Sequence, residues 1–316
     1  MTAKTPAESR RKHVNPMNRQ SLGDRIISVF TYVIYAFLAF ACAYPFYYII
    51  INSISANNLS ERGKVLFWPM QVHFENYTRM ANIPGLLDAA KISVMRTVIG
   101  MTLTILISSF LGFMFTRETL WKRKLWYRFV AVTMYFNAGI IPWVLCMRNL
   151  GLNNNFWGYI LPMVIQPFYI ILCKTYCESV PRELQEAAEI DGAGTLTVFF
   201  RVMLPVIKPI LATIAIFAAV NQWNAFQDNL LLMPNRPDLD TLQYKLWQYI
   251  TQANSLKAML SNTTNTNAIM ASMATVATAT SIRMSVTVVV VLPVMMIYPF
   301  FQRYFTRGIM IGAVKG

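Results

Sequence analysis

The fold class of this chain is set by long uncharged stretches, of which the longest reads IISVFTYVIYAFLAFACAYPFYYIII from Ile26 to Ile51. About 20 apolar residues in a helix are enough to cross the hydrocarbon core of a bilayer. Such segments must be helical, because an isolated strand in lipid would leave its backbone groups unpaired. We therefore expect an all-α membrane protein with six transmembrane helices, the other five being Thr97–Thr116, Phe129–Met147, Phe156–Cys173, Pro209–Gln227 and Met284–Gln302.

The composition supports a membrane protein and argues against other classes. Of the 316 residues, 55% are hydrophobic and 13% charged, whereas soluble domains carry about 25% charged residues. The net charge of +14 would suggest nucleic-acid binding if the basic residues formed a patch on a soluble domain. Here they lie between apolar runs, as the positive-inside rule describes, so we expect contact with membrane lipid and none with nucleic acid.

The distribution of Lys and Arg predicts the orientation. Most of the 28 basic residues lie before the first span, between the second and third spans, between the fourth and fifth, and after the sixth. Because cytoplasmic loops carry the excess of positive charge, both termini are expected in the cytoplasm. The predicted organisation is a basic cytoplasmic tail (1–25), a first helix with an outer loop (26–91), a transmembrane core (92–302) and a cytoplasmic C-terminal tail (303–316). Within the core, a cytoplasmic loop covers 178–208 and a long outer loop 228–283.

The loop between the fourth and fifth spans begins ESVPRELQEAAEIDGAGT at Glu178. Residues Glu183–Ile190 are good helix formers with acidic side chains near the N-terminus, where the helix dipole favours them. Ala187 and Ala188 give this short helix a flat side that another surface can approach, and Gly192 suits the turn that ends it. A second apolar helical run, Val198–Leu204, is expected to lead into the fifth span.

This loop resembles the EAA loop of ABC-importer permeases, a family with a type I permease fold. The matching pattern is Glu-Ala-Ala-x-x-Asp-Gly-Ala, followed by a phenylalanine and a Leu-Pro pair at the expected offsets. In that family the loop forms a coupling helix that docks into a groove on the cytoplasmic ATPase. The resemblance implies that role for Glu186, Ala187, Ala188, Asp191, Gly192, Ala193, Phe199 and Pro205.

A second resemblance narrows the family to the carbohydrate importers, and within them to the maltose-permease-like second subunit for oligosaccharides or polysaccharide fragments. It rests on NAGIIP from Asn137, NLGLN from Asn149, Trp223-Asn224 and the tail Gly308–Gly316, and covers nearly the whole chain after residue 25. It implies a second permease subunit, two ATPase subunits that carry ATP and Mg, and an extracytoplasmic substrate-binding protein. It also implies a multi-pass location in the cytoplasmic membrane of a prokaryote.

The sequence contains no phosphate-binding G-x-x-x-x-G-K-[ST] motif, so ATP hydrolysis is expected on a partner subunit. The two histidines, His13 in the N-terminal tail and His73 in an outer loop, are expected to be solvated. No nucleophile–base pair or cluster of metal ligands is apparent. We therefore expect no catalytic residue, metal site or bound cofactor on this chain, which would not itself be an enzyme.

The end of the fifth span holds candidate substrate contacts. Asn221, Asn224 and Asp228 are spaced i, i+3 and i+7, which places them on one face of a continuous helix, and Trp223 lies on an adjacent face. Amides and carboxylates bond sugar hydroxyls, and an indole offers an apolar face to a sugar ring. Asn137 in the third span is a further candidate of the same kind. The alternative is that these residues anchor the helix at the membrane surface or bond neighbouring helices.

Two other functions are compatible with parts of the sequence. The same type of importer could carry an amino acid, phosphate or spermidine, but the carbohydrate-like motifs argue against this. A free-standing channel or secondary transporter would more often have charged residues in its spans or paired repeat halves, and we see neither pattern.

Overall fold

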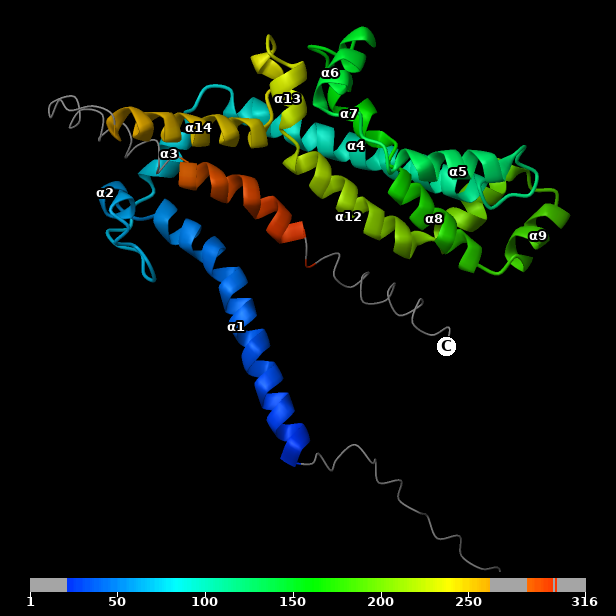
Figure 1. Ribbon diagram of the computed structural model, residues 1–316, viewed down its shortest axis with the longest axis horizontal. Coiled ribbons are helices and arrows are strands. Elements are labelled where there is room, and N and C mark those ends of the chain that lie inside the picture. The colour runs from blue at the N-terminus through cyan, green and yellow to red at the C-terminus, as the bar shows by residue number, and fades with distance from the viewer. Residues whose placement is uncertain (1–21, 262–282, 298, 300–316) are drawn as a thin grey trace, which may run out of the picture. The chain divides into compact units, whose positions relative to one another are not determined.

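The computed structural model describes residues 22–261, 283–297 and 299, and every regular element in these ranges is a helix (Figure 1). The basic tail up to residue 21, the C-terminal tail and the end of the sixth predicted span lie outside the described residues. The chain divides into two compact units after Tyr48. The all-helical architecture expected from the sequence is thus present throughout the described part.

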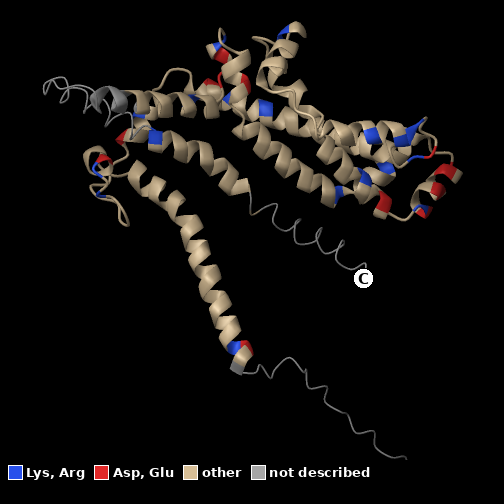
Figure 2. Cartoon of the chain, viewed as in Figure 1, with Lys and Arg blue, Asp and Glu red and all other residues tan. Residues whose placement is uncertain are grey.

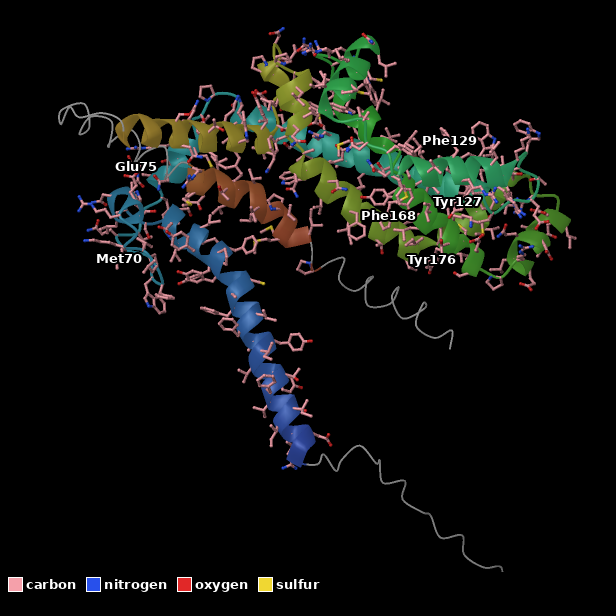
Figure 3. All side chains as sticks on the ribbon, viewed as in Figure 1. Met70, Glu75, Tyr127, Phe129, Phe168 and Tyr176 are labelled. Carbon is pink, nitrogen blue, oxygen red and sulfur yellow. The ribbon has the colours of Figure 1, made fainter. Side chains whose placement is uncertain are left out.

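Helix α1 (Leu22–Ser53) contains the first predicted span and extends it at both ends. Its side chains project on all sides (Figure 3), and its most apolar window is 0% buried within the protein. A helix that is apolar all round needs an apolar environment. A lipid bilayer provides it, which agrees with a membrane-spanning segment.

Helix α4 (Leu86–Met114) is the longest described helix of the second unit and contacts most of the other long helices there. It packs against α7 (Trp157–Val164), α8 (Pro167–Ser179) and α12 (Lys208–Asn224). The predicted span Thr97–Thr116 begins 11 residues after the start of α4. The preceding turns contain the charged residues Asp88, Lys91 and Arg96, which interrupt the apolar run.

Among the described residues, two helices are long and apolar enough to cross a membrane. The number rises to as many as four if each of two bent helix pairs forms one span. The pair α7 and α8 bends by 47° where Pro167 begins α8, since proline cannot continue the hydrogen-bond ladder of the preceding turn. The segment Thr195–Val206 meets α12 at 82°. The apolar helix Arg283–Ile297 is shorter and covers most of the sixth predicted span.

The third predicted span, Phe129–Met147, is not one continuous helix. Helix α5 (Arg123–Thr133) ends five residues into this span, and α6 (Ile140–Asn149) begins after an irregular segment. In that segment the Asn137 side chain accepts a hydrogen bond from the Gly139 N–H at 2.9 Å. Asparagine side chains bond the nearby backbone in this way in turns and so compete with helix formation. Hydropathy alone does not detect such a break.

The loops contain further short helices. The first outer loop holds α2 and α3, and the loop before the sixth predicted span holds α13, a 3₁₀ turn and α14. The loop between the fourth and fifth predicted spans holds α9, a short α10, a π-helical segment and α11. Their bounds are α2 (Asn57–Glu61), α3 (Glu75–Ala81), α9 (Glu183–Ile190), α10 (Thr195–Thr197), η2 (Val198–Met203), α11 (Leu204–Val206), α13 (Gln227–Leu232), η3 (Pro237–Leu239) and α14 (Leu242–Ser261).

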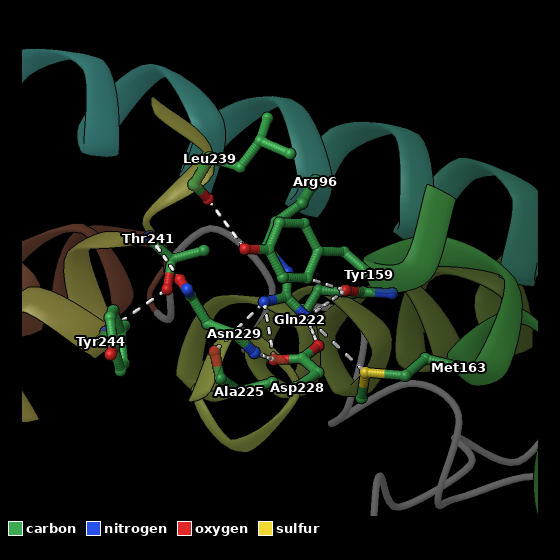
Figure 4. A network of polar contacts seen from close by, with 10 residues as sticks. All are labelled: Arg96, Tyr159, Met163, Gln222, Ala225, Asp228, Asn229, Leu239, Thr241 and Tyr244. Atoms are coloured by element: carbon green, nitrogen blue, oxygen red, sulfur yellow. Dashed lines mark hydrogen bonds and ion pairs between the residues drawn. The ribbon is translucent and has the colours of Figure 1, made fainter. Parts of the chain in front are cut away.

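A buried arginine joins α4 to the end of α12 and to α13 (Figure 4). The Arg96 side chain is 0% exposed, and its Nη2 lies 2.5 Å from Oδ2 of Asp228. Its Nε and Nη2 donate to Oε1 of Gln222, each at 3.2 Å, and its Nη1 donates to the carbonyl of Ala225 at 3.2 Å. The guanidinium also lies 4.5 Å from the ring centroid of Tyr159. A buried charge is tolerated only with such pairing.

The same network continues toward α14. The backbone N–H of Asn229 donates to Asp228, and the Asn229 amide donates to Asp240 at 3.1 Å. The backbone N–H of Thr241 donates a hydrogen bond to Oδ1 of Asn229 at 2.8 Å. Lys245 pairs with Asp240 at 2.7 Å. These contacts hold the segment between α12 and α14 in one arrangement.

The Arg96→Ala variant is expected to destabilise the second unit by about 3–5 kcal/mol, because it leaves the Asp228 carboxylate buried without its partner. Thermal unfolding of the purified protein in detergent would measure the effect. The Arg79→Ala variant is the matched control, since the Arg79–Glu75 pair is 46% and 59% exposed and such pairs contribute about 0–1 kcal/mol. Equal stability of the two variants would contradict the central role of Arg96.

Helix α4 approaches α8 closely at Gly112. A Cβ at Gly112 would lie 2.5 Å from Cβ of Cys173 and 2.9 Å from the backbone nitrogen of Lys174. Gly112→Ala should therefore push the helices apart and lower the melting temperature, at a cost of about 1–3 kcal/mol. A Cβ at Gly194 meets nothing within 4 Å, so Gly194→Ala should melt close to the wild type.

Candidate coupling helix and central pocket

Helix α9 forms where the sequence favours it. Glu183 and Glu186 lie in its first turn, where carboxylates interact well with the exposed N–H groups. After the helix, Gly192 adopts a φ of +82°, and the N–H of Ala193 donates to the carbonyl of Ala188 at 2.9 Å. The sequence therefore produces a short helix with a defined end.

One side of α9 faces the protein. Gln185 is buried, and Ala188 packs with Ala193 against an apolar cluster that includes Phe113 and Phe199. Phe199 is 1% exposed, and its ring centroid lies 5.6 Å from that of Phe113. Phe199 thus supports the loop from inside.

The other side of α9 faces outward. Glu186, Ala187 and Asp191 are exposed, as are Gly192 after the helix and Pro205 in α11. Ile190 is 86% exposed and Leu184 45% exposed. Ile190 was not among the residues singled out from the sequence, although an isoleucine three residues after Ala187 would have indicated an apolar stripe on this face. Apolar side chains exposed beside carboxylates are typical of a surface that a partner covers.

Charged residues gather around α9 and the loop between α4 and α5 (Figure 2). Arg117 in that loop forms an ion pair with Glu189 and donates from Nη1 to Oε1 of Gln185 at 3.3 Å. Arg182 forms an exposed pair with Glu118 at 3.4 Å. Between the loop, the end of α8 and α9 is a hollow of about 420 Å³ with mainly polar and charged lining.

A larger pocket, of about 560 Å³, lies between the α5–α6 connection, α6, α7 and the junction of α12 with α13. Its polar side chains are mainly amides, and its walls include aromatic and aliphatic groups. The lining residues are Asn137, Gly139, Ile140, Trp143, Gly158, Pro162, Met163, Asn224, Ala225, Phe226, Gln227, Asp228 and Leu231.

Three of the five candidate substrate residues line this one pocket. Asn137 comes from the irregular segment before α6, Asn224 from the last residue of α12, and Asp228 from α13. They are far apart in sequence or in different elements, and tertiary packing brings them together. The Asp228 carboxylate forms an ion pair with Arg96 and accepts a hydrogen bond from the N–H of Asn229. The uncharged amides of the pocket are therefore the polar groups available to a ligand.

The predicted single helical face of Asn221, Asn224 and Asp228 is wrong. Helix α12 ends at Asn224, and Ala225 adopts an extended conformation with φ −70° and ψ 129°. Arg96 binds the carbonyl of Ala225, which satisfies a group that a helix end otherwise leaves unpaired. Asp228 therefore begins a new helix instead of continuing the old one.

The other two candidates lie elsewhere. Asn221 donates from Nδ2 to the hydroxyl of Tyr169 at 2.9 Å and borders a separate hollow of about 10 Å³. Trp223 donates from Nε1 to the carbonyl of Val290 at 2.9 Å. It joins α12 to the helix Arg283–Ile297, so its indole is committed to packing.

The pocket also contains Trp143, Phe226 and Gln227, which sequence reasoning did not include among the substrate contacts. Gln227 is the last residue of the predicted fifth span and carries the same amide chemistry as Asn224, which is a signal in the sequence. Trp143 and Phe226 carry none, since an aromatic residue in an apolar run reads equally well as a lipid contact.

The sequence is similar to several bacterial transport proteins. It is 31% identical over 291 residues to the polygalacturonan/rhamnogalacturonan transport system permease protein YtcP of Bacillus subtilis, covering 91% of this chain and 99% of that protein. It is 32% identical to protein LplC of the same organism, over 86% and 89% of the two chains. It is 26% identical to the arabinooligosaccharides transport system permease protein AraQ of Halalkalibacterium halodurans, over 89% and 94%.

The fold is also similar to that of a solved structure. One chain of a bacterial ABC transporter involved in the import of the acidic polysaccharide alginate matches with a TM-score of 0.79 and 28% identity, over 91% of this chain and 99% of that one. The family profile described as the binding-protein-dependent transport system inner membrane component matches residues 14–311. The chain belongs to this family of transport-system membrane components.

Proposed function

We propose that this chain is the permease subunit of an ATP-driven importer and that α9 is the helix through which separate ATPase subunits move it. The observation that carries the proposal is the outward face of α9, where Ile190 is 86% exposed beside Ala187 and Glu186. An isoleucine so exposed gains apolar contact energy when a groove covers it. The resemblance of this loop to the EAA loop supports the same partner.

The proposed substrate is a carbohydrate, and an oligosaccharide in particular. The pocket combines the amides of Asn137, Asn224 and Gln227 with the rings of Trp143 and Phe226. Amides both donate to and accept from hydroxyls, and aromatic faces pack against the apolar faces of sugar rings. The names of YtcP and AraQ, and the alginate importer, support the same substrate class.

The complete importer would contain a second permease subunit, two ATPase subunits that bind ATP and Mg, and an extracytoplasmic substrate-binding protein. This chain would contribute six transmembrane helices with both termini in the cytoplasm of a prokaryotic cell. Closure of the ATPases would move α9, and the two permeases would expose the pocket alternately to the two sides of the membrane. The bacterial relatives and the family's description as an inner membrane component support this arrangement.

The Ile190→Asp variant should weaken the docking of the ATPases and abolish uptake. Loss of a central apolar anchor costs about 2 kcal/mol or more, which is roughly 30-fold in affinity. Copurification of the ATPase with the tagged permease would measure docking. Uptake of an oligosaccharide mixture from digested polygalacturonan, rhamnogalacturonan, arabinan and alginate would measure transport.

Leu150→Asp is the matched control, because Leu150 is also exposed, at 65%, but follows α6, outside the cytoplasmic loop. It should retain both ATPase docking and uptake. An assembled and active Ile190→Asp importer would refute the assignment of α9.

The Asn224→Leu variant tests the pocket. It preserves the approximate size of the side chain but removes its hydrogen bonds, so uptake of the same mixture should fall about tenfold. Copurification of the ATPase should be unchanged, which separates this effect from a docking defect.

Asn235→Leu changes the same chemical group at an exposed position outside the pocket and should transport normally. Wild-type uptake by Asn224→Leu would remove Asn224 from the substrate path.

A further inference from the structure

The loop between α4 and α5 places one arginine against two successive turns of α9. Gln185 and Glu189 are four residues apart and therefore lie on the same face of that helix. Arg117 contacts both, through its ion pair with Glu189 and its hydrogen bond to Gln185. The planar guanidinium group of arginine has several N–H donors in fixed directions, so it can bond two acceptors at once. The ammonium group of a lysine lacks this fixed geometry.

The backbone of Arg117 is fixed to the end of α4. Its N–H donates to the carbonyl of Met114 at 3.1 Å, and Nη1 of Arg123 donates to the carbonyl of Thr116 at 2.8 Å. The Arg117 guanidinium lies 5.8 Å from the ring centroid of Phe113 in the last turns of α4. The Arg117 side chain is only 14% exposed, which reduces the screening of its ion pair by water.

In the described part of the chain, the polar side-chain contacts to Glu183–Ile190 come from Arg117, and the exposed Glu118–Arg182 pair lies just before the helix. On this side the hollow of about 420 Å³ separates the loop from α9, and apolar packing through Ala188 occurs on the side of Phe199. Arg117 therefore bridges a space that apolar packing does not fill.

We infer that Arg117 is a positioning residue that ties the coupling helix α9 to α4, so that displacement of α9 by an ATPase also displaces α4. The inference rests on the proposed function of α9. Helix α4 holds Arg96, which pairs with Asp228 in the wall of the central pocket. Helix α4 thus carries Arg96, which pairs with a carboxylate in the pocket wall, and is followed by Arg117, which pairs with a carboxylate of the coupling helix.

The test uses the complete importer in proteoliposomes and measures both ATP hydrolysis and uptake of the oligosaccharide mixture defined above. Arg117→Ala should assemble with the ATPases and hydrolyse ATP, but the sugar taken up per ATP should fall about fivefold or more, the scale of an ordinary coupling energy. A role in stability alone would lower the yield of complex and reduce hydrolysis and uptake together. An unchanged ratio would therefore overturn the inference.

Two further variants sharpen the result. Arg182→Ala is the matched control, because it removes an arginine pair between the same loop and the start of α9, but one that is 75% and 70% exposed. It should keep the wild-type ratio, and a loss equal to that of Arg117→Ala would overturn the specific role of Arg117. The double variant Arg117→Glu with Glu189→Arg restores an ion pair and should recover part of the ratio that Arg117→Glu alone loses. Absence of recovery would also count against the inference.

The comparison with Ile190→Asp separates this inference from the proposed function. If Ile190→Asp loses the ATPase but Arg117→Ala keeps the normal ratio, only the inference about Arg117 fails. If Ile190→Asp assembles and transports normally, the assignment of α9 itself fails.

Discussion

The second unit depends on one buried ion pair. Arg96 is fully buried on α4, and its charge is balanced by Asp228, with Gln222 and the carbonyl of Ala225 as further acceptors. Such a cation is costly in an apolar environment unless every donor has a partner. The chain meets this requirement by ending α12 at Asn224 and starting α13 directly afterward, so the course of the backbone and the solvation of the arginine are linked.

This arrangement also determines what the pocket can bind. Asp228 lies in its wall, yet its carboxylate is already paired. The groups left for a ligand are amides and aromatic rings, which suit hydroxyl-rich, uncharged parts of a molecule. The Asp228 carboxylate, a candidate ligand contact in the sequence, is thus already bonded to Arg96 and to the N–H of Asn229.

Near the C-terminal end of α4 most side chains of α9 are exposed instead of buried. On the neighbouring helix α9, Glu186, Ala187 and Ile190 form an exposed face, while Phe199 and Ala188 attach the helix from inside. Helix α4, which is 29 residues long, connects the two regions: Arg96 lies within it, and Arg117, which contacts α9, lies after its last residue. Helices transmit displacement well because their backbone hydrogen bonds resist bending, and this is how events at α9 would reach the pocket.

The sequence by itself determined the class of protein, the positions of α1, α12 and the loop around Glu186, and most of the polar residues at the pocket. These features depend on hydropathy and on local motifs, which are readable along the chain. Only the tertiary structure showed that Phe129–Met147 is broken, that Asn221 and Trp223 lie outside the pocket, and that Trp143 and Phe226 lie within it. It also revealed that Arg96 pairs with Asp228, 132 residues away, and that Arg117 bonds Gln185, 68 residues away. Side chains this far apart in sequence meet only after helices have packed, and hydropathy does not specify which polar groups will face one another.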